Sequence, residues 1–272
     1  MSRVTATGAP AFSAHEAQNS PRSKSFVDDI TILHGPTGLM GRFFLASDAY
    51  FRERGVTVSF GTFQEILAAN EANRDSWKPL FPSYHPDYHT FNADNSFAFI
   101  GRDKTGKVVL TQAGILFRLN DTTFHDFASA LRVNYDDPDK MKRPGEKCIP
   151  TAPSLKIMRG NVLFGGATWF HPSVRGAGLT EVTTRTSRAY GYTRFKTDYS
   201  TSFMVSGPLN GGMAKRAGFP NVEWGIDFEN SPMGNFSCAF CWLKPDYLLE
   251  DLERFVTEAA PQVDAGVRER RA

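Results

Sequence analysis

Residues 171–180, with the sequence His-Pro-Ser-Val-Arg-Gly-Ala-Gly-Leu-Thr, contain the residue types that could bind a phosphate group. Gly176 and Gly178 would let the backbone come close to a ligand, and Arg175 adds a positive charge. The helical pattern that starts at about Leu179 places unpaired N–H groups and the positive end of a helix dipole at the same point. The stretch therefore predicts a cradle for a phosphate or pyrophosphate. The alternative is a tight turn into an ordinary helix.

Two elements must position this turn. An apolar strand is predicted over residues 161–170, directly before it. A helix is predicted to follow from Leu179. Five of its residues recur at helical spacing and share one face, whereas Glu181, Arg185 and Arg188 fall on other faces. The residues of the first face are Leu179, Val182, Thr183, Thr186 and Tyr190.

The turn has neither the G-K-[ST] of a Walker loop nor the G-x-G-x-x-G of a dinucleotide-binding fingerprint. It resembles the R-x-x-G-x-G/A turn of the GNAT superfamily of N-acyltransferases, in which an Arg or Gln and the following backbone amides hold the pyrophosphate of coenzyme A. Arg175 and Gly178 match the first two fixed positions, while Thr180 stands where the family usually has Gly or Ala. Residues 214–219, Ala-Lys-Arg-Ala-Gly-Phe, resemble the family's helix that ends in Gly-Phe. The hairpin turn at 103–106 comes where that fold would place it.

The resemblance implies an enzyme, a GNAT-type N-acetyltransferase or a related acyltransferase. Such an enzyme moves an acetyl or other short acyl group from coenzyme A to an amine of a small molecule by direct attack. The donor substrate would be acetyl-CoA or another acyl-CoA, and no metal is expected. The arm of the donor would pair with the end of the strand, and its pyrophosphate would bind the turn. The residues implied for donor binding are Trp169, Phe170, His171, Val174, Arg175, Gly176, Ala177, Gly178, Leu179 and Thr180.

Three residues are candidates for the chemistry itself. An unperturbed histidine titrates near neutrality, and His171 lies beside the turn, so it is a candidate general base, or else a structural His that caps the turn. Tyr199 and Ser206 flank the next predicted strand and are candidates for contact with the thiol or the substrate. Many members of the family have a Tyr four residues before Gly-Phe, which protonates the leaving thiolate. Ala214 stands at that position here, so that acid is missing or comes from elsewhere.

Other functions remain open. One is a longer-chain acyltransferase that takes its donor from acyl carrier protein, similar to N-acyl amino acid synthases, since 23 Phe residues leave room for a fatty chain. A second is a non-catalytic coenzyme-A-binding or sensory domain. A nucleotide-phosphate enzyme ranks last, because no acidic metal-binding cluster accompanies the turn.

Composition limits the class of protein. With 272 residues and 41% hydrophobic content, the chain can bury one large core or two modest ones. A net charge of +2 argues neither for a nucleic-acid partner nor for an acidic scaffold, and no nucleic-acid partner is expected. No apolar run approaches the roughly 20 residues that span a membrane, and no apolar signal segment is present. We expect a cytoplasmic protein without a membrane partner, and a homodimer is possible.

Cysteine and histidine spacing argues against a metal site. The three cysteines suit a reducing compartment, and Cys238 and Cys241 lie three apart in a predicted strand, where they face opposite sides. Two core thiols are expected there. His85 and His89 have the i, i+4 spacing of some metal sites, but the intervening Pro disfavours a helix. The aromatic and polar stretch 77–92 is predicted to line or cover a pocket.

The fold predicted is α/β (α+β), a single mixed, splayed sheet with helices on both faces, GNAT-like, with an extra N-terminal helix and a long insertion before the central strand. A flexible leader is expected over 1–34, the domain over 35–260 and a solvated tail over 261–272. The insertion 119–160 is expected to form a cap over the substrate. Helices are predicted over residues 37–54, 123–133 and 206–217. Three more helices are predicted to begin at the capping box of Thr62 and Glu65, at Leu179 and at Pro245. Strands are predicted over 56–60, 97–102, 107–118, 161–170, 194–205, 222–228 and 236–244.

Overall fold

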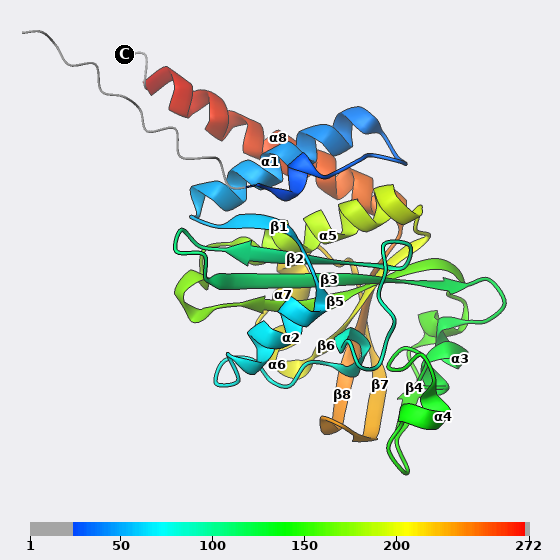
Figure 1. Cartoon of the computed structure of the whole chain (residues 1–272). Coiled ribbons are helices and arrows are strands. Elements are labelled where there is room, and N and C mark those ends of the chain that lie inside the picture. The colour runs from blue at the N-terminus through cyan, green and yellow to red at the C-terminus, as the bar shows by residue number, and fades with distance from the viewer. Residues whose placement is uncertain (1–23, 270–272) are drawn as a thin grey trace, which may run out of the picture.

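A computed structural model describes residues 24–269, with side chains described through Glu258. Over these residues the chain forms one mixed, eight-stranded sheet in the order β1-β2-β3-β5-β6-β8-β7-β4 (Figure 1). The strands are β1 (Thr57–Gly61), β2 (Ser96–Arg102), β3 (Val108–Leu119), β4 (Lys147–Pro150), β5 (Gly160–Phe170), β6 (Tyr199–Val205), β7 (Asn221–Ser231) and β8 (Gly234–Leu243). The helices are α1 (Thr37–Glu53), α2 (Phe63–Glu71), α3 (Phe124–Ser129), α4 (Pro138–Met141), α5 (Leu179–Phe195), α6 (Ser206–Asn210), α7 (Met213–Arg216) and α8 (Pro245–Glu269).

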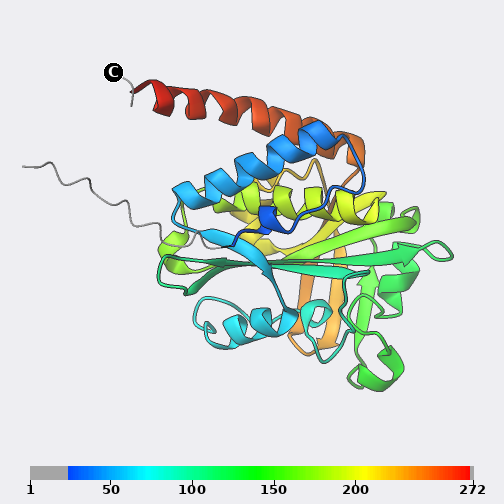
Figure 2. The ribbon, with the colours of Figure 1, turned by 45° about the horizontal axis from the view of Figure 1, so that its top comes forward.

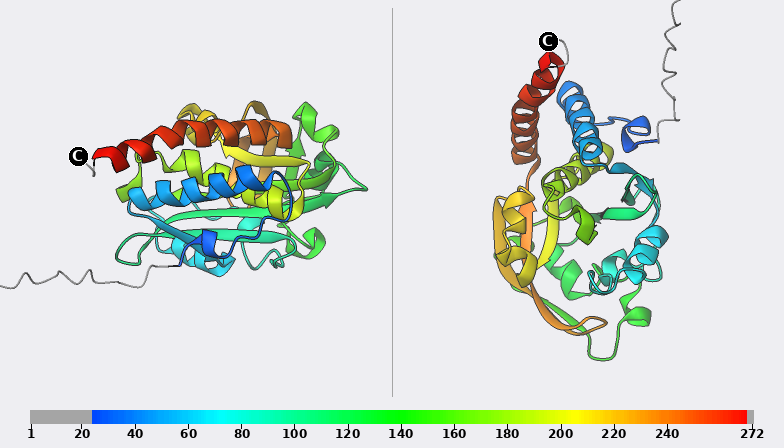
Figure 3. Two further views of the ribbon diagram at one scale, coloured as in Figure 1. Left: turned by 90° about the horizontal axis from the view of Figure 1, so that it is seen from above. Right: turned by 90° about the vertical axis from the view of Figure 1, so that its left-hand side faces the viewer.

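Helices cover both faces of the sheet, as predicted. On one face α5 packs against the sheet, and α1 and α8 run side by side outside it (Figures 2 and 3). The rings of Phe43 and Phe255 join α1 to α8 with centroids 5.5 Å apart. The other face carries α2 and the chain after it, which pack on a second group of buried residues that includes Ile66 and Tyr84. The predicted capping box of α2 is confirmed, since Thr62 and Glu65 exchange bonds at 2.8 and 3.1 Å.

The sheet divides between β5 and β6. These strands pair in parallel over only three residues each, 162–164 with 199–201. Beyond Phe164, β5 continues with β3, whereas β6 runs along β8 as far as the pair Val205–Cys238. In Figure 1, β2 and β3 accordingly run across the view while β7 and β8 run down it. The predicted splay is therefore present, and it opens toward the end of β5.

A bulge lies in the outer half of β5. The register with β3 shifts between Thr111 and Ala113, so that β5 has one more residue than β3 there. Ala167 adopts a positive φ of 49°, which is unusual for a residue with a side chain. Bulges bend a strand and often lie next to functional sites. This one turns β5 away from β6 at the place where the two strands have stopped pairing.

Several predicted boundaries are wrong. A strand was predicted from residue 194, but residues 194–195 end α5 and β6 begins only at Tyr199. The helix extends beyond the apolar pattern that predicted it. The single helix predicted over 206–217 is two short helices, α6 and α7, broken where Gly212 adopts a φ of 76°. The helix predicted over 123–133 ends at Ser129, and Leu131 has a positive φ of 60° that cannot continue it.

The insertion 119–160 is built into the core. Its strand β4 pairs with β7 and extends that side of the sheet. Phe124 and Tyr135 are fully buried, and the Tyr135 hydroxyl donates to Glu146 at 2.9 Å. The segment therefore has its own polar and apolar anchors in the core, and its role as a cap over the substrate stays a prediction.

The ends of the expected domain also differ. Residues 1–23 of the expected leader and 270–272 of the expected tail lie outside the described residues. Within the leader, Phe26 is fully buried and its ring contacts those of Phe44, Phe51 and Phe99. Helix α8 continues to Glu269, through most of the segment expected to be a tail. None of the helices in the described part of the chain is long and apolar enough to cross a bilayer.

Candidate functional site

A cavity of about 520 Å³ lies where β5 and β6 separate. The outer half of β5 forms one wall and the end of β6 forms the other. The segment after α2 closes a third side, which confirms for residues 77–81 and Tyr84 the prediction that this aromatic stretch lines a pocket. The residues that line the cavity include Ser76, Trp77, Lys78, Phe81, Tyr84, Thr168, Trp169, Arg175, Thr180, Ser202, Phe203, Met204, Met213, Arg216, Met233, Phe236 and Cys238.

The outer half of β5 presents a free backbone edge to this cavity. Pairing with β6 stops at Phe164, so the groups of residues 165–170 that face β6 have no strand partner. Gly166 leaves room for an aromatic ring beside this edge. A Cβ at Gly166 would lie 2.4 Å from the Tyr84 hydroxyl, so only glycine lets that ring lie against the strand. A polar, extended molecule could complete the sheet along this edge, as peptides do at free strands.

The predicted cradle lies directly after this edge. Gly176 and Gly178 have φ values of 81° and 74°, and Gly178 is the N-cap of α5. Among the hydrogen bonds of the described chain, none uses the backbone N–H of residues 176–180 as a donor. Five successive donors are thus available where the helix dipole is positive, which suits an anion of two linked phosphates.

Arg175 joins the cradle to the cavity. Its guanidinium donates to the Phe170 carbonyl at 3.0 Å and to the Ser76 carbonyl at 3.1 Å. The side chain is exposed, and it lines the cavity. These two bonds hold its charge beside the free N–H groups and also fasten the segment at Ser76 to the end of β5.

Helix α1 supports the turn from behind. Arg54 donates from Nε to the Ala177 carbonyl at 2.7 Å, and its guanidinium lies 3.3 Å from the centre of the Tyr50 ring. The Tyr50 hydroxyl lies so close to Gly178 that a Cβ there would be 2.6 Å away. The sequence predicted a helix over 37–54 and gave no sign that it reaches the turn. The contact depends on tertiary packing between segments more than 120 residues apart.

The sequence matches no family model and no curated protein. The fold is similar to that of several solved acetyltransferases. One is the aminoglycoside acetyltransferase AAC(6')-Ib in complex with coenzyme A and kanamycin, at 14% identity over 71% of this chain and 96% of that one, with a TM-score of 0.40. Another is a mutant of the spermidine N-acetyltransferase SpeG from Vibrio cholerae, at 8% identity over 72% and 96%, with a TM-score of 0.40. An uncharacterized protein from Bacillus halodurans matches at 11% identity over 75% and 91%, with a TM-score of 0.44. These likenesses are distant, so the function of this chain must be inferred from its own cavity and turn.

The three candidate catalytic residues do not come together. His171 lies just after β5, outside the cavity lining, with Nε2 at 2.8 Å from the Lys107 amine and Nδ1 at 2.7 Å from the Ser173 hydroxyl. Tyr199 lies at the closed end of the splay, opposite Val162. Ser206 is exposed at the start of α6. Their roles stay predictions.

One contact in the cavity wall was missed by the sequence reasoning. The indole rings of Trp77 and Trp169 stack at 5.2 Å with an angle of 7° between them. Trp169 also donates from its indole N–H to the Ser76 hydroxyl at 3.3 Å. Trp169 was expected to contact the donor through its backbone alone. The stack holds the segment after α2 against the free edge of β5.

The cavity has an uneven distribution of charge. Its charged lining residues are Lys78, Arg175 and Arg216, and no carboxylate is among the described residues that line it. Away from the turn the walls are apolar, with Phe81, Phe203, Phe236 and Met233. The site is therefore positive at the cradle and apolar at the far end.

Ala214, which stands where the resemblance implied a Tyr, lies buried in α7. The Cys238 thiol lines the cavity, but burial raises its pKa to about 12, so it stays protonated at neutral pH. The expectation of two core thiols at Cys238 and Cys241 is confirmed, since both are free and buried. They pair with Val205 and Ser202 of β6, in register positions that point to opposite faces.

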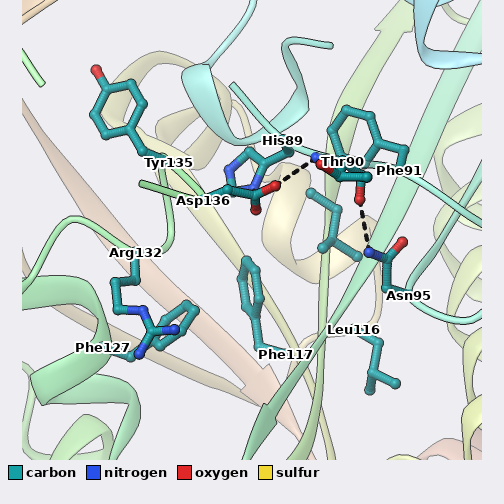
Figure 4. A pocket seen from close by; sticks show the side chains of 11 residues that line it. His89, Thr90, Phe91, Asn95, Leu116, Phe117, Phe127, Arg132, Tyr135 and Asp136 are labelled. Atoms are coloured by element: carbon teal, nitrogen blue, oxygen red, sulfur yellow. Dashed lines mark hydrogen bonds and ion pairs between the residues drawn. The ribbon is translucent and has the colours of Figure 1, made fainter. Parts of the chain in front are cut away.

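A second, smaller hollow of about 130 Å³ lies near His89 (Figure 4). His89 Nδ1 is 2.9 Å from an Asp136 oxygen, and the Thr90 N–H donates to the other oxygen at 2.7 Å. Burial lowers the pKa of His89, and Asp136 offsets this only in part. His85 instead contacts the Tyr88 ring. Within residues 24–258 no group of three metal-binding side chains comes together. The contact between His89 and Asp136 joins the chain after α2 to the insertion 119–160.

Proposed function

We propose that this chain is a coenzyme-A-dependent N-acyltransferase that acts on an amine by direct attack in the cavity between β5 and β6. The supporting observation is one continuous arrangement: a free strand edge that ends at five backbone N–H groups without acceptors. A pantetheine arm carries amides that suit the strand edge, and a pyrophosphate suits the helix N-terminus. An ordinary tight turn would not need a free strand edge leading into it.

Donor binding uses both parts of this arrangement. The amides of the pantetheine arm would pair with residues 165–170, and the pyrophosphate would accept bonds from the N–H groups of residues 176–180. Arg175 and Arg54 would add positive charge near the phosphates. Held at both ends, the thioester carbonyl would be fixed in the cavity, which removes entropy from the encounter with the amine.

The chemistry requires a neutral amine and support for the developing oxyanion. Backbone N–H groups on the free edge of β5 would polarise the thioester carbonyl as charge develops on its oxygen. His171 is our proposed base. Because its ring does not line the cavity, the proton of the ammonium would reach it through water. Tyr199 and Ser206 are proposed only as contacts for the bound molecules.

The walls also suggest the acceptor. A second cation on the acceptor would meet Lys78 and Arg216 with no carboxylate among the described lining residues to balance it. The aromatic far end favours an apolar or aromatic group next to the amine. We therefore propose a small apolar monoamine, rather than a polyamine, as the acceptor class.

The same apolar far end supports a second candidate, a longer acyl chain in place of a large acceptor. In that case the donor could be acyl carrier protein, whose arm ends in the same pantetheine group. A non-catalytic coenzyme-A-binding domain is a third candidate, favoured by Ala214 at the position of the usual acid.

Release of free thiol from a series of acyl-CoA donors with a panel of amines separates these candidates. Turnover of acetyl-CoA with apolar monoamines supports the main proposal. Preference for long acyl chains supports the second candidate, and binding without thiol release supports the third. A folded protein that binds none of the donors contradicts all three.

A further inference from the structure

Arg188 of α5 is a buried cation without a carboxylate partner. It fell outside the predicted apolar face of the helix, but only 4% of it is exposed. Its Nη2 donates to the Ala217 carbonyl at the end of α7, and its guanidinium lies 4.7 Å from the centre of the Phe219 ring. Its Nε and Nη1 are buried and have no acceptor in the described chain.

Burying a charged guanidinium in this way is costly. Arginine is rarely buried unless it is paired, because removing an ion from water carries a large free-energy cost. The nearest carboxylate, Asp251, is held by Arg185 at 2.7 Å, and no carboxylate of residues 24–258 lies within ion-pair distance of Arg188. Burial and the nearby Arg185 lower the pKa of Arg188 to about 9, so the group is still charged at neutral pH. A ligand that brings negative charge would offset this cost.

Arg188 lines a small chamber behind the splay, whose walls combine polar and apolar residues. The chamber has a volume of about 30 Å³, enough for one or two waters, and its polar walls include Gln112 and Ser187. Gln112 accepts from the Thr168 hydroxyl at 2.5 Å and donates to Ser187 at 3.3 Å, so a polar chain joins the β5 bulge to α5. The residues that line both this chamber and the large cavity are Gly165, Thr168, Ser202, Met204 and Met213.

We propose that Arg188 stabilises the negative charge that develops on the leaving sulfur of the acyl donor. This inference rests on the proposed function. The amine nitrogen forms a bond to the thioester carbon and gives its proton to a base. The carbon–sulfur bond then breaks, and the electron pair leaves with the sulfur as a thiolate. Arg188 holds a positive charge beside that thiolate until the thiolate sulfur takes a proton from water.

The position of α7 supports this assignment. Ala214 occupies the place of the missing phenol, and Arg188 is bonded to Ala217 on the same short helix. A cation that lowers the pKa of the leaving thiol removes the need for an acid that protonates it, because a more stable thiolate is a better leaving group. The other titratable groups that act on Arg188 are Arg185, Asp251, Tyr247 and Cys241, and none of these four lines either cavity.

The test is the pKa of the coenzyme A thiol when it is bound to the full chain. The ultraviolet absorbance of the thiolate is followed against pH for bound and free coenzyme A. We expect a bound pKa lower than that of free coenzyme A by about 1–3 units, the range for an opposite charge at close distance. In Arg188→Met the bound pKa should return most of the way to the free value, and kcat should fall at least about tenfold.

Two further variants make the outcome decisive. Arg188→Lys keeps a positive charge and should retain part of the shift, which also covers the case that Arg188→Met does not fold. Lys215→Met removes one charge from an exposed position on α7 that lines neither cavity, and it should behave like the parent. If Arg188→Met binds coenzyme A with the same thiol pKa as the parent, the inference is wrong while the proposed function stands. If the parent itself does not bind coenzyme A, the proposed function fails first.

Discussion

Replacing Gly178 by alanine perturbs the turn in two separable ways. The residue has a φ of 74°, and an L residue in that region costs about 1–2 kcal/mol. The new Cβ would also lie 2.6 Å from the Tyr50 hydroxyl, a distance that forces a shift. Overpacking of this kind adds about 1–3 kcal/mol. We therefore expect Gly178→Ala to lower the free energy of unfolding by about 2–5 kcal/mol, the sum of these two ranges.

The chain provides matched controls for both effects. Gly176 has a φ of 81° and no atom within 4 Å of its would-be Cβ, so Gly176→Ala should show only the backbone cost of about 1–2 kcal/mol. In a Tyr50→Phe background the nearest remaining ring atom is Cζ at 3.8 Å from the Cβ, which is an ordinary contact. Gly178→Ala in that background should therefore cost no more than Gly176→Ala.

Urea unfolding of the four variants and the parent measures these costs. A double-mutant cycle between positions 50 and 178 should give a coupling close to the overpacking cost. Calorimetry with coenzyme A should show that Gly178→Val loses more affinity than Gly178→Ala, because a β-branched side chain keeps a phosphate away from the backbone. Equal stability of the Gly176 and Gly178 alanine variants would refute the packing of α1 on the turn. Unchanged affinity in both Gly178 variants would show that the ligand does not lie against it.

Three further outcomes are expected. Arg175→Glu should abolish coenzyme A binding in calorimetry, because the change puts an anion beside the phosphates. The far-ultraviolet circular dichroism should stay that of the parent, since only two surface hydrogen bonds are lost. Binding at the parent's affinity would contradict the cradle. If His171 is the base, kcat/KM should rise with pH around the range where an ordinary histidine loses its proton, about 6.5. The variant His171→Gln should lose that rise, and its rate should fall at least about tenfold. An unchanged pH profile would give His171 a structural role. Phe124→Ala should lower the free energy of unfolding by about 3–5 kcal/mol because its side chain is fully buried; a change of less than about 1 kcal/mol would mean that the insertion is a loosely attached cap.

The turn and the elements beside it could be predicted because their signals are local. Glycines at 176 and 178, a cation at Arg175 and a helical pattern from Leu179 act within ten residues, and the structure has a helix N-terminus there. Strand pairs joined by hairpins are recognised in the same way, as in the turn at 103–106. The splay itself was expected from the resemblance alone, since nothing in the pattern of β5 says where its pairing with β6 stops.

The supporting contacts could not be predicted because they depend on long-range packing. Arg54 meets Ala177 across 123 residues of chain, and Trp77 stacks on Trp169 across a comparable separation. Arg188 looked like a residue of a solvated helix face, because periodicity assigns a charged residue to the outside by default. Only the path of α7 over α5 shows that it is buried. The pairing of the insertion with the sheet was likewise missed, since a four-residue strand such as β4 leaves too short a pattern to recognise.

The central claim is that coenzyme A lies along β5 with its pyrophosphate at the start of α5. Titration of the isotope-labelled protein with coenzyme A, monitored through backbone amide chemical shifts, tests it residue by residue. We predict the largest shifts at the five amides of residues 176–180 and along residues 165–170, with no comparable change at His89 in the second hollow. Shifts confined to that hollow, or none at saturating coenzyme A, would contradict the claim.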